Sequence, residues 1–250
     1  MTSHFQNSVG FENGFVSRNR TGSGKFIFLF LYLFLTAVLQ AQGTGFFQSI
    51  DWSVRGSILF FPEKNGNASA PMPILPSLGG SASYPLSDRL AMELSLDLYG
   101  TTYDYDYSLK RAVPVNDENR SAFVMGALLG VQPVFRFRPM GDRFTIRAYG
   151  GLGFDLRIIF SAYGLKDSDP HQTAPYTLGE ARKEISSYFW GSGRFIFPFI
   201  GGGMDFPIMD GLQLGFDLRV WLPVWRIWSG EDLPFIEGFR FGIGFRLTFR

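Results

Sequence analysis

Charged side chains recur at every second position within otherwise apolar stretches of this chain. Nearly all of the bases among them are arginines, and arginine forms fixed, bidentate ion pairs with carboxylates. Two roles suit such a set: a structural salt-bridge network, or a polar path for small solutes. The candidate residues are Arg55, Glu93, Asp97, Arg136, Arg147, Asp155, Arg157, Asp217, Arg219, Arg240 and Arg246, with Asp205 as a further candidate.

Histidine and cysteine chemistry is almost absent from the chain. It contains Cys 0 and His 2, which excludes disulfides, thiolate metal sites, cysteine nucleophiles and a histidine cluster for zinc or catalysis. His171 has no serine motif beside it, so we expect a solvated loop histidine rather than a catalytic one. We therefore predict no enzymatic activity, no metal and no cofactor. The balance of Lys+Arg 23 against Asp+Glu 22 also gives no reason to expect nucleic acid.

Two aromatic groups could bind a ligand or a partner. Near one strand end, an inner apolar patch that could take a hydrophobic molecule would consist of Phe195, Phe197, Phe199 and Trp221. A second group alternates tyrosine with aspartate and consists of Tyr103, Asp104, Tyr105, Asp106 and Tyr107. We expect this second group to be a solvated hairpin extension. It could also serve as a partner-binding surface or a weak Ca²⁺ site, because carboxylates are hard oxygen ligands.

The N-terminus carries a candidate export signal. An almost unbroken apolar run covers residues 26–39, with basic residues before it and the small residue Ala41 after it. This order describes a secretory signal peptide. A helix of that length spans about 21 Å, which is short of the roughly 30 Å of a hydrocarbon core and argues against a permanent anchor. We predict a signal peptide with a polar extension over 1–41 and a barrel domain over 42–250.

Most of the remaining chain alternates apolar with polar residues. Strict alternation predicts strands with one apolar and one polar face, and no comparable helical stripe stands out, so helices should be few. The glycine-rich runs 150–153 and 201–203 lie inside such strands and should make room for bulky neighbours rather than bind phosphate. Eight strands are predicted, at about 52–60, 78–84, 90–98, 123–138, 144–158, 188–206, 212–222 and 239–249.

Short and long connections join the predicted strands. Three short ones share a Pro-x-x-Asp form, in which proline presets φ and aspartate accepts hydrogen bonds from the following backbone. Their marker residues, expected at the periplasmic end, are Pro85, Asp88, Pro139, Asp142, Pro207 and Asp210. The four longer, polar loops fall at about 62–73, 100–121, 162–187 and 223–236. Tight turns at one end and long loops at the other describe an up-and-down meander.

Two kinds of closed barrel fit this meander. A soluble, lipocalin-like barrel is apolar inside and polar outside, whereas a membrane barrel is the reverse. Glycine and arginine share the polar face here, and glycine leaves room for long side chains that cross a narrow interior. About ten residues per strand at 3.4 Å, tilted about 45°, rise roughly 24 Å, which matches an apolar band of about 25 Å. The membrane barrel is therefore the leading prediction.

The chain as a whole resembles small bacterial outer-membrane barrels of the OmpA, OmpX and OmpW type. The features that carry this resemblance are the signal peptide, the eight strands, the three turns, the four loops and the apolar run Phe239–Phe249. The resemblance covers about residues 50–250. It implies an all-β, closed, up-and-down antiparallel transmembrane barrel in the bacterial outer membrane, a monomer surrounded by outer-membrane lipid and recognised by the barrel-assembly machinery. Those chains commonly end on an aromatic residue, whereas Arg250 follows Phe249 here. For the OmpW type, the resemblance also implies binding of a hydrophobic molecule at the inner aromatic patch.

Three functions stay open from the sequence. The first is a structural or narrow-passage role for small or hydrophobic solutes. The second is a surface interaction protein, such as an adhesin, which binds an extracellular partner through its long loops while its lumen is closed. The third is a soluble exported barrel with a hydrophobic ligand inside.

Overall fold

The computed structural model describes residues 49–62, 74–115, 122–161, 164–171, 175–229 and 238–249. The predicted signal peptide at 1–41 lies outside these residues, as does most of the predicted loop at 62–73. Gln48–Arg250 form one compact unit. None of the helices within the described ranges has the length and apolarity needed to cross a membrane.

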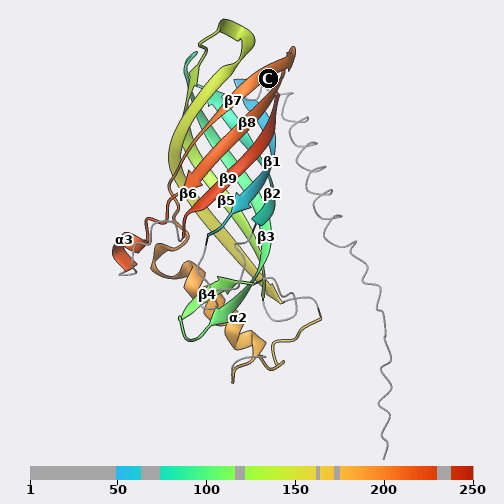
Figure 1. The fold of residues 1–250 in the computed structure, drawn as a ribbon, viewed down its shortest axis with the longest axis vertical. Coiled ribbons are helices and arrows are strands. Elements are labelled where there is room, and N and C mark those ends of the chain that lie inside the picture. Colours follow the sequence, from blue (N-terminus) through green and yellow to red (C-terminus); the bar gives the residue numbers. More distant parts are fainter. Residues whose placement is uncertain are drawn as a thin grey trace, which may run out of the picture. The chain divides into compact units, whose positions relative to one another are not determined.

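Eight antiparallel strands form a closed barrel (Figure 1). Each pairs with its neighbour along the chain, and β1 pairs with β9 to close the ring, with Trp52 opposite Phe249. Closure satisfies the backbone donors and acceptors that an open edge would expose. The predicted eight-stranded barrel is confirmed. Its strands are β1 (Asp51–Phe60), β2 (Ile74–Pro85), β3 (Leu90–Asp106), β5 (Ala122–Phe137), β6 (Thr145–Ser161), β7 (Phe199–Met209), β8 (Leu212–Trp221) and β9 (Arg240–Phe249).

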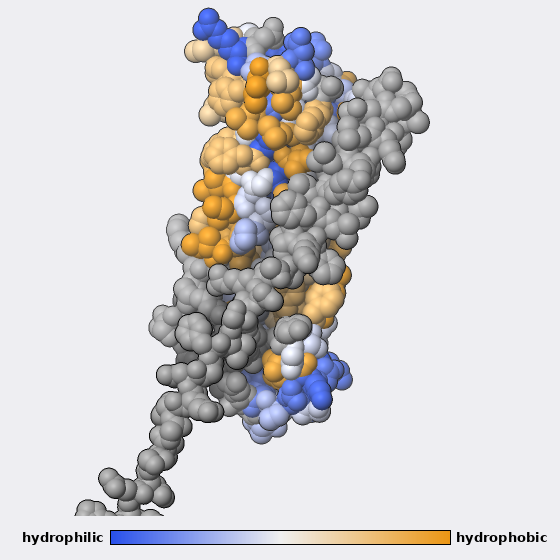
Figure 2. All heavy atoms as spheres, turned by 90° about the vertical axis from the view of Figure 1, so that its right-hand side faces the viewer, coloured by the Kyte–Doolittle hydropathy of each residue, from blue (hydrophilic) through white to orange (hydrophobic). Residues whose placement is uncertain are grey.

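The two faces of these strands differ in polarity, as period-two alternation requires. The outward face carries large exposed apolar side chains on every strand, including Ile58, Phe135, Ile158, Ile200 and Phe245. Figure 2 shows this surface on one side of the barrel as a hydrophobic band between hydrophilic ends. Because the apolar side chains point outward and the charges inward, the soluble-barrel alternative is wrong.

The first two predicted short turns close hairpins at the same end of the barrel. Pro85 is the last residue of β2, and the side chain that accepts a backbone bond in this turn is Ser87, from the Leu90 amide at 3.2 Å. The second turn contains the 3₁₀ helix η2 (Gly141–Arg143), whose first residue has a φ of 65° that favours glycine. Nothing is described of the Asp142 side chain, whereas Asp88 and Pro139 are exposed.

The third predicted turn begins at Asp210 rather than at Pro207. Pro207 lies inside β7, where the register shifts between Pro207 and Met209, and the reversal itself occurs at Asp210-Gly211. Gly211 has a φ of 77°, as a tight turn demands. Proline cannot donate to a ladder, so it marks a bulge here rather than a turn start.

A helix replaces the first part of the predicted strand at 188–206. Helix α2 (Leu178–Trp190) is followed by the 3₁₀ helix η3 (Gly191–Gly193), and β7 begins only at Phe199. A capping box starts α2, since Thr177 accepts from the Glu180 amide while Glu180 accepts from the Thr177 amide. The residues that α2 buries are spaced three and four apart and are Leu178, Ala181, Ile185 and Phe189. This short apolar stripe outweighs the local alternation.

The other long loops also contain structure. Strand β3 continues past the barrel and pairs with the short strand β4 (Arg111–Pro114), so the predicted loop at 100–121 begins as a hairpin. The predicted loop at 223–236 contains the short helix α3 (Arg226–Ser229). In Figure 1, α2, α3 and β4 lie at the end of the barrel opposite the β5–β6 turn. We call this end the extracellular end and the opposite one the periplasmic end, following the orientation expected for the short turns.

Candidate functional site

The barrel interior holds the predicted charged set. Ten of the eleven candidates are buried, and Arg136 is half-buried at the rim, where it pairs with Asp51 at 3.0 Å and bonds the Ser83 hydroxyl. Asp205 is buried with them. Each of these residues lies at an inward-facing position of its strand. The alternation of side chains along the strands is therefore enough to place all of these charges in the barrel interior.

Asp97 lies at the centre of this interior, with 1% of its surface exposed. Arg55 donates to it through Nε at 3.0 Å and Nη2 at 2.6 Å, in a bidentate fork. Arg219 donates through Nη1 at 2.5 Å and Nη2 at 3.2 Å. One carboxylate thus fixes two guanidinium groups from β1 and β8.

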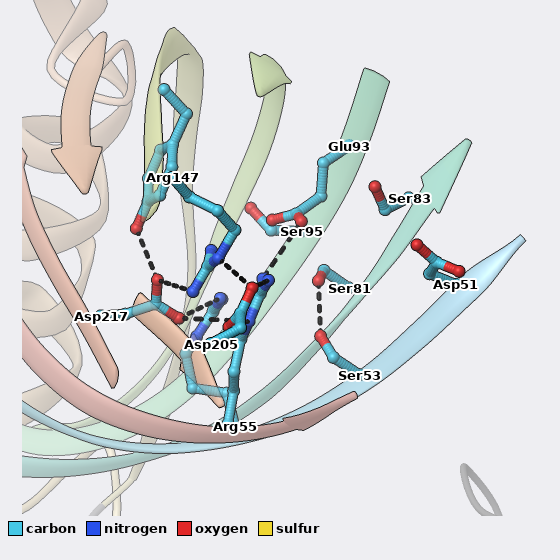
Figure 3. Close-up of polar contacts among 12 residues, drawn as sticks. Asp51, Ser53, Arg55, Ser81, Ser83, Glu93, Ser95, Arg147, Asp205 and Asp217 are labelled. Atoms are coloured by element: carbon cyan, nitrogen blue, oxygen red, sulfur yellow. Dashed lines mark hydrogen bonds and ion pairs between the residues drawn. The ribbon is translucent and has the colours of Figure 1, made fainter. Parts of the chain in front are cut away.

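Three further carboxylates, those of Asp205, Asp217 and Glu93, continue the network toward the periplasmic turns (Figure 3). Arg147 lies between Asp205, at 2.7 Å from its Nε, and Asp217, at 2.9 Å from its Nη2. Arg246 contacts Asp205 at 3.0 Å and Glu93 at 3.3 Å. The network therefore bridges strands on all sides of the barrel, from β3 to β6, β7, β8 and β9.

Neutral side chains complete this part of the interior. Gln132 donates to Glu93 at 2.8 Å, and the Ser53 and Ser81 hydroxyls bond each other at 2.7 Å. No sequence signal distinguishes these residues, because serine and glutamine occur on many polar faces. In this part of the interior, Arg55, Arg147, Arg219 and Arg246 face Glu93, Asp97, Asp205 and Asp217, so four bases balance four acids.

A second charged group lies nearer the extracellular end. Asp155 accepts from Arg157 Nε at 2.5 Å, from Tyr99 at 2.9 Å and from Arg240. The two guanidinium groups are also stacked on aromatic rings: Arg240 lies 3.9 Å from the Phe197 centroid and Arg157 lies 4.0 Å from that of Phe189. These cation–π contacts offset the excess of one base in this group.

An aromatic layer separates the two charged groups. Phe197, Phe199 and Trp221, three of the four predicted patch residues, are each 2% exposed in one buried cluster. Phe199 packs against Trp221 and Tyr149, with centroids 6.0 and 6.5 Å apart. Phe195 does not join them, because its ring packs against Trp190 instead, at 5.7 Å. The patch is filled by the protein's own side chains.

Glycines make room for this filling. A Cβ on Gly126 would lie 2.0 Å from the Tyr99 ring, and one on Gly203 would lie 2.7 Å from Nη2 of Arg147. Any side chain at either position would displace a member of the interior. The prediction that 201–203 leave room for bulky neighbours is confirmed.

Helix α2 covers the extracellular mouth. Its Phe189 ring meets the fully buried Tyr103 ring edge-on, with centroids 4.9 Å apart, and Ile185 joins the same cluster. Tyr103 and Arg157 both point into the barrel from its extracellular rim, so the helix packs over the interior rather than beside the barrel. Sequence reasoning missed this cap, which a search for three- and four-residue apolar spacing over 178–189 could have found.

The predicted solvated histidine is wrong. His171 is 7% exposed, and its Nε2 lies 2.7 Å from Oδ1 of Asp104 on the β3–β4 hairpin. Beside it, Tyr107 stacks on Tyr176 with centroids 4.1 Å apart. Burial, together with Tyr176 and Glu184, raises the pKa of Tyr107 to about 12. The two loops thus pack into one unit, the extracellular platform, which comprises the β3–β4 hairpin, residues 164–171 and 175–177, and α2.

The tyrosine–aspartate run serves mainly to build this platform. Tyr103 is fully buried, and Tyr105 packs edge-on against Tyr107. Asp106 accepts from the Ser108 hydroxyl and amide and from the Leu109 amide; these bonds outweigh the opposing effect of burial and lower its pKa. Within the described ranges, no group of three or more His, Cys, Asp or Glu side chains is arranged to hold a metal ion.

Comparisons with known proteins give structural likenesses of low sequence identity. No family model and no curated protein matches the sequence. Neisserial surface protein A is 9% identical, with a TM-score of 0.46 over 80% of this chain and 96% of that one. OprG from Pseudomonas aeruginosa is 13% identical, with a TM-score of 0.44 over 80% and 96% of the two chains. A major outer membrane protein from Thermus thermophilus is 12% identical, with a TM-score of 0.44 over 80% and 98%.

With TM-scores below 0.5, these likenesses carry no weight beside the chain's own geometry. The closed antiparallel pairing, the apolar outer band and the charged interior are the defining features of outer-membrane barrels. The chain is a small eight-stranded β-barrel of the bacterial outer-membrane type.

Proposed function

We propose that this protein is an integral barrel of the bacterial outer membrane whose lumen is closed and whose activity lies in its extracellular platform. It is then a surface interaction protein rather than a channel or an enzyme, and it needs no cofactor. We further propose that it is a monomer inserted by the barrel-assembly machinery. The filling of the interior carries this proposal.

Three successive levels support a closed lumen. Nearest the periplasmic end, four bases and four acids cross the interior and neutralise each other. Above them lies the aromatic layer with Phe199 and Trp221, and above that the group around Asp155, with α2 over the mouth. Eight strands leave an interior just wide enough for side chains to fill. A solute would have to displace paired charges and packed rings in turn.

Planar-bilayer conductance of the full-length protein tests the closed lumen. We expect insertion without discrete channels, with a porin measured in parallel to show that the bilayer registers them. Heat-modifiable gel mobility of the same sample reports that the barrel is folded. Reproducible channels from the folded protein would contradict the proposal and restore the narrow-passage function.

A loop variant tests the platform. Replacing residues 104–113 by a short glycine–serine turn removes the hairpin that packs against residues 171 and 176. The part of β3 that pairs with β5 ends at Tyr103 and stays intact. We expect cells displaying this variant to lose adhesion to host cells or extracellular matrix that the parent binds. Adhesion that survives the replacement, with surface display verified, would refute the role of the platform.

A further inference from the structure

A depression lies between helix α2 and the extracellular part of strand β6. It has a volume of about 370 Å³, within the range of small-ligand sites. The residues of strand β6 that line it are Arg157, Ile158 and Ile159, and those of helix α2 are Gly179, Arg182, Lys183 and Ser186. The strand wall therefore combines two apolar side chains with Arg157, which pairs with Asp155, and the helix wall is partly basic.

The charges of α2 are segregated between two of its faces. Gly179, Arg182, Lys183 and Ser186 are spaced at three and four residues, so they share the face that lines the depression. The helix acids, Glu180 and Glu184, act instead on the platform tyrosines, because both raise the pKa of Tyr107. The bases of α2 thus face the depression and its acids face away.

The strand wall belongs to the outer edge of the apolar band. Ile158 is 54% exposed on the outward face of β6, and Phe160, two residues further toward the extracellular end, is 45% exposed. Phe160 pairs with Phe123 of β5, which is also exposed. The depression therefore lies where acyl chains meet the headgroup layer.

The two bases differ in their existing contacts. Lys183 is exposed and makes no hydrogen bond or ion pair within the described part of the chain. Arg182 is largely buried; it pairs with Asp167 and bonds the Ser161 hydroxyl, while its Nε has no partner among the described residues. Asp167 is 73% exposed and holds Arg182 from the solvent side.

We propose that this depression binds the phosphate headgroup of an anionic lipid of the outer leaflet. The phosphate lies against the ammonium group of Lys183 and the guanidinium group of Arg182, whose Nε is a buried donor without an acceptor among the described residues. The acyl chains lie along Ile158 and Phe160. This site lies on the face of α2 that is turned away from the platform tyrosines, and it goes beyond the proposed function.

Lipid retention in nanodiscs tests the site. The full-length protein is placed in phosphatidylcholine nanodiscs containing either phosphatidic acid or diacylglycerol with the same chains, and native mass spectrometry counts the retained lipid. We expect phosphatidic acid to be retained in preference. Lys183→Gln should weaken its binding about fivefold, because one basic residue at a membrane surface contributes about 1 kcal/mol. Asp167→Asn should strengthen binding by releasing Arg182, a gain that misfolding cannot produce.

Lys110→Gln is the matched control, because it removes one exposed charge at the same end of the barrel, in the β3–β4 turn. Equal losses in Lys183→Gln and Lys110→Gln would overturn the site in favour of general attraction. Equal retention of phosphatidic acid and diacylglycerol would also overturn it. Inorganic phosphate at millimolar concentration that displaces the lipid from the parent protein would show that the site takes soluble phosphate and not a lipid.

Discussion

Neutralising Asp97 tests whether the interior network stabilises the barrel. Asp97→Asn keeps the shape of the side chain and removes its charge, while Arg55 and Arg219 stay buried opposite it. Asp217, at 3.9 Å, is then the only carboxylate among the described residues that still pairs with Arg55. The variant therefore isolates the charge from the packing.

The cost follows from the burial of both partners. Removing one partner of a buried ion pair destabilises a protein by about 3–5 kcal/mol, because the remaining charge is left uncompensated in low dielectric. Asp97 holds two guanidinium groups through four contacts of 3.2 Å or less, so we expect a value near the upper end, about 5 kcal/mol. With a urea slope of about 2 kcal/mol per M, that loss lowers the unfolding midpoint by about 2.5 M.

Urea unfolding in lipid vesicles, followed by tryptophan fluorescence, measures this change. The control is Asp51→Asn, which breaks the same kind of pair at the periplasmic rim, where Arg136 and Asp51 are 12% and 15% exposed. There we expect a loss of less than about 1 kcal/mol, as for solvent-accessible pairs. Losses that agree within about 1 kcal/mol would refute the reasoning, because they would mean that water compensates Arg55 and Arg219.

Three further variants probe the packing of the interior and of the platform. Gly126→Val should lower the free energy of unfolding by more than about 3 kcal/mol, since the new Cβ would lie 2.0 Å from the Tyr99 ring. In the control, Gly56→Val, the new Cβ has no neighbouring atom within 4 Å, so this variant should fold normally. Equal unfolding free energies of the two variants would contradict the packing around Gly126. Phe189→Ala should speed amide hydrogen exchange in α2 without opening a channel, and measurable conductance would show that the helix alone closes the barrel. Asp106→Asn should speed exchange of the amides of Ser108 and Leu109 at neutral pH, but not at a pH well below the pKa of the folded carboxyl group. That pKa is lowered, so the stabilisation is present above the unfolded value of about 3.9 and is lost as the pH falls through the folded value. A difference that persists at low pH would contradict this assignment.

The barrel was predictable because one physical signal repeats along it. Inward charges and outward apolar residues alternate strictly over β8 and β9, and a slip of one residue would exchange the two faces. The same alternation correctly predicts that Asp97, Asp217 and Arg246 point into the barrel, although it does not identify the residues that they contact. Which base meets which acid could not be predicted, because register and shear decide it, as in the pairing of Arg147 with both Asp205 and Asp217.

The extracellular end was not predictable in the same way. The segment 195–199 is apolar on both parities, so its pattern did not reveal that Phe195 packs on Trp190 while Phe197 and Phe199 point inward. Polar residues and prolines surround His171 in sequence and favour a solvated side chain, yet Asp104 binds it from another loop. Contacts between loops depend on tertiary packing, and they produce no periodic pattern in the sequence from which they could be predicted.

The interior network also bears on how the barrel assembles. Its partners are far apart in the chain: Arg219 and Asp97 are separated by 122 residues, and Arg246 and Glu93 by 153. The last strand supplies Arg246, so a half-formed sheet would leave Glu93 of β3 without this partner until β9 meets β1. Partly inserted intermediates are then penalised electrostatically, and ring closure and burial of the charges should occur as one cooperative step.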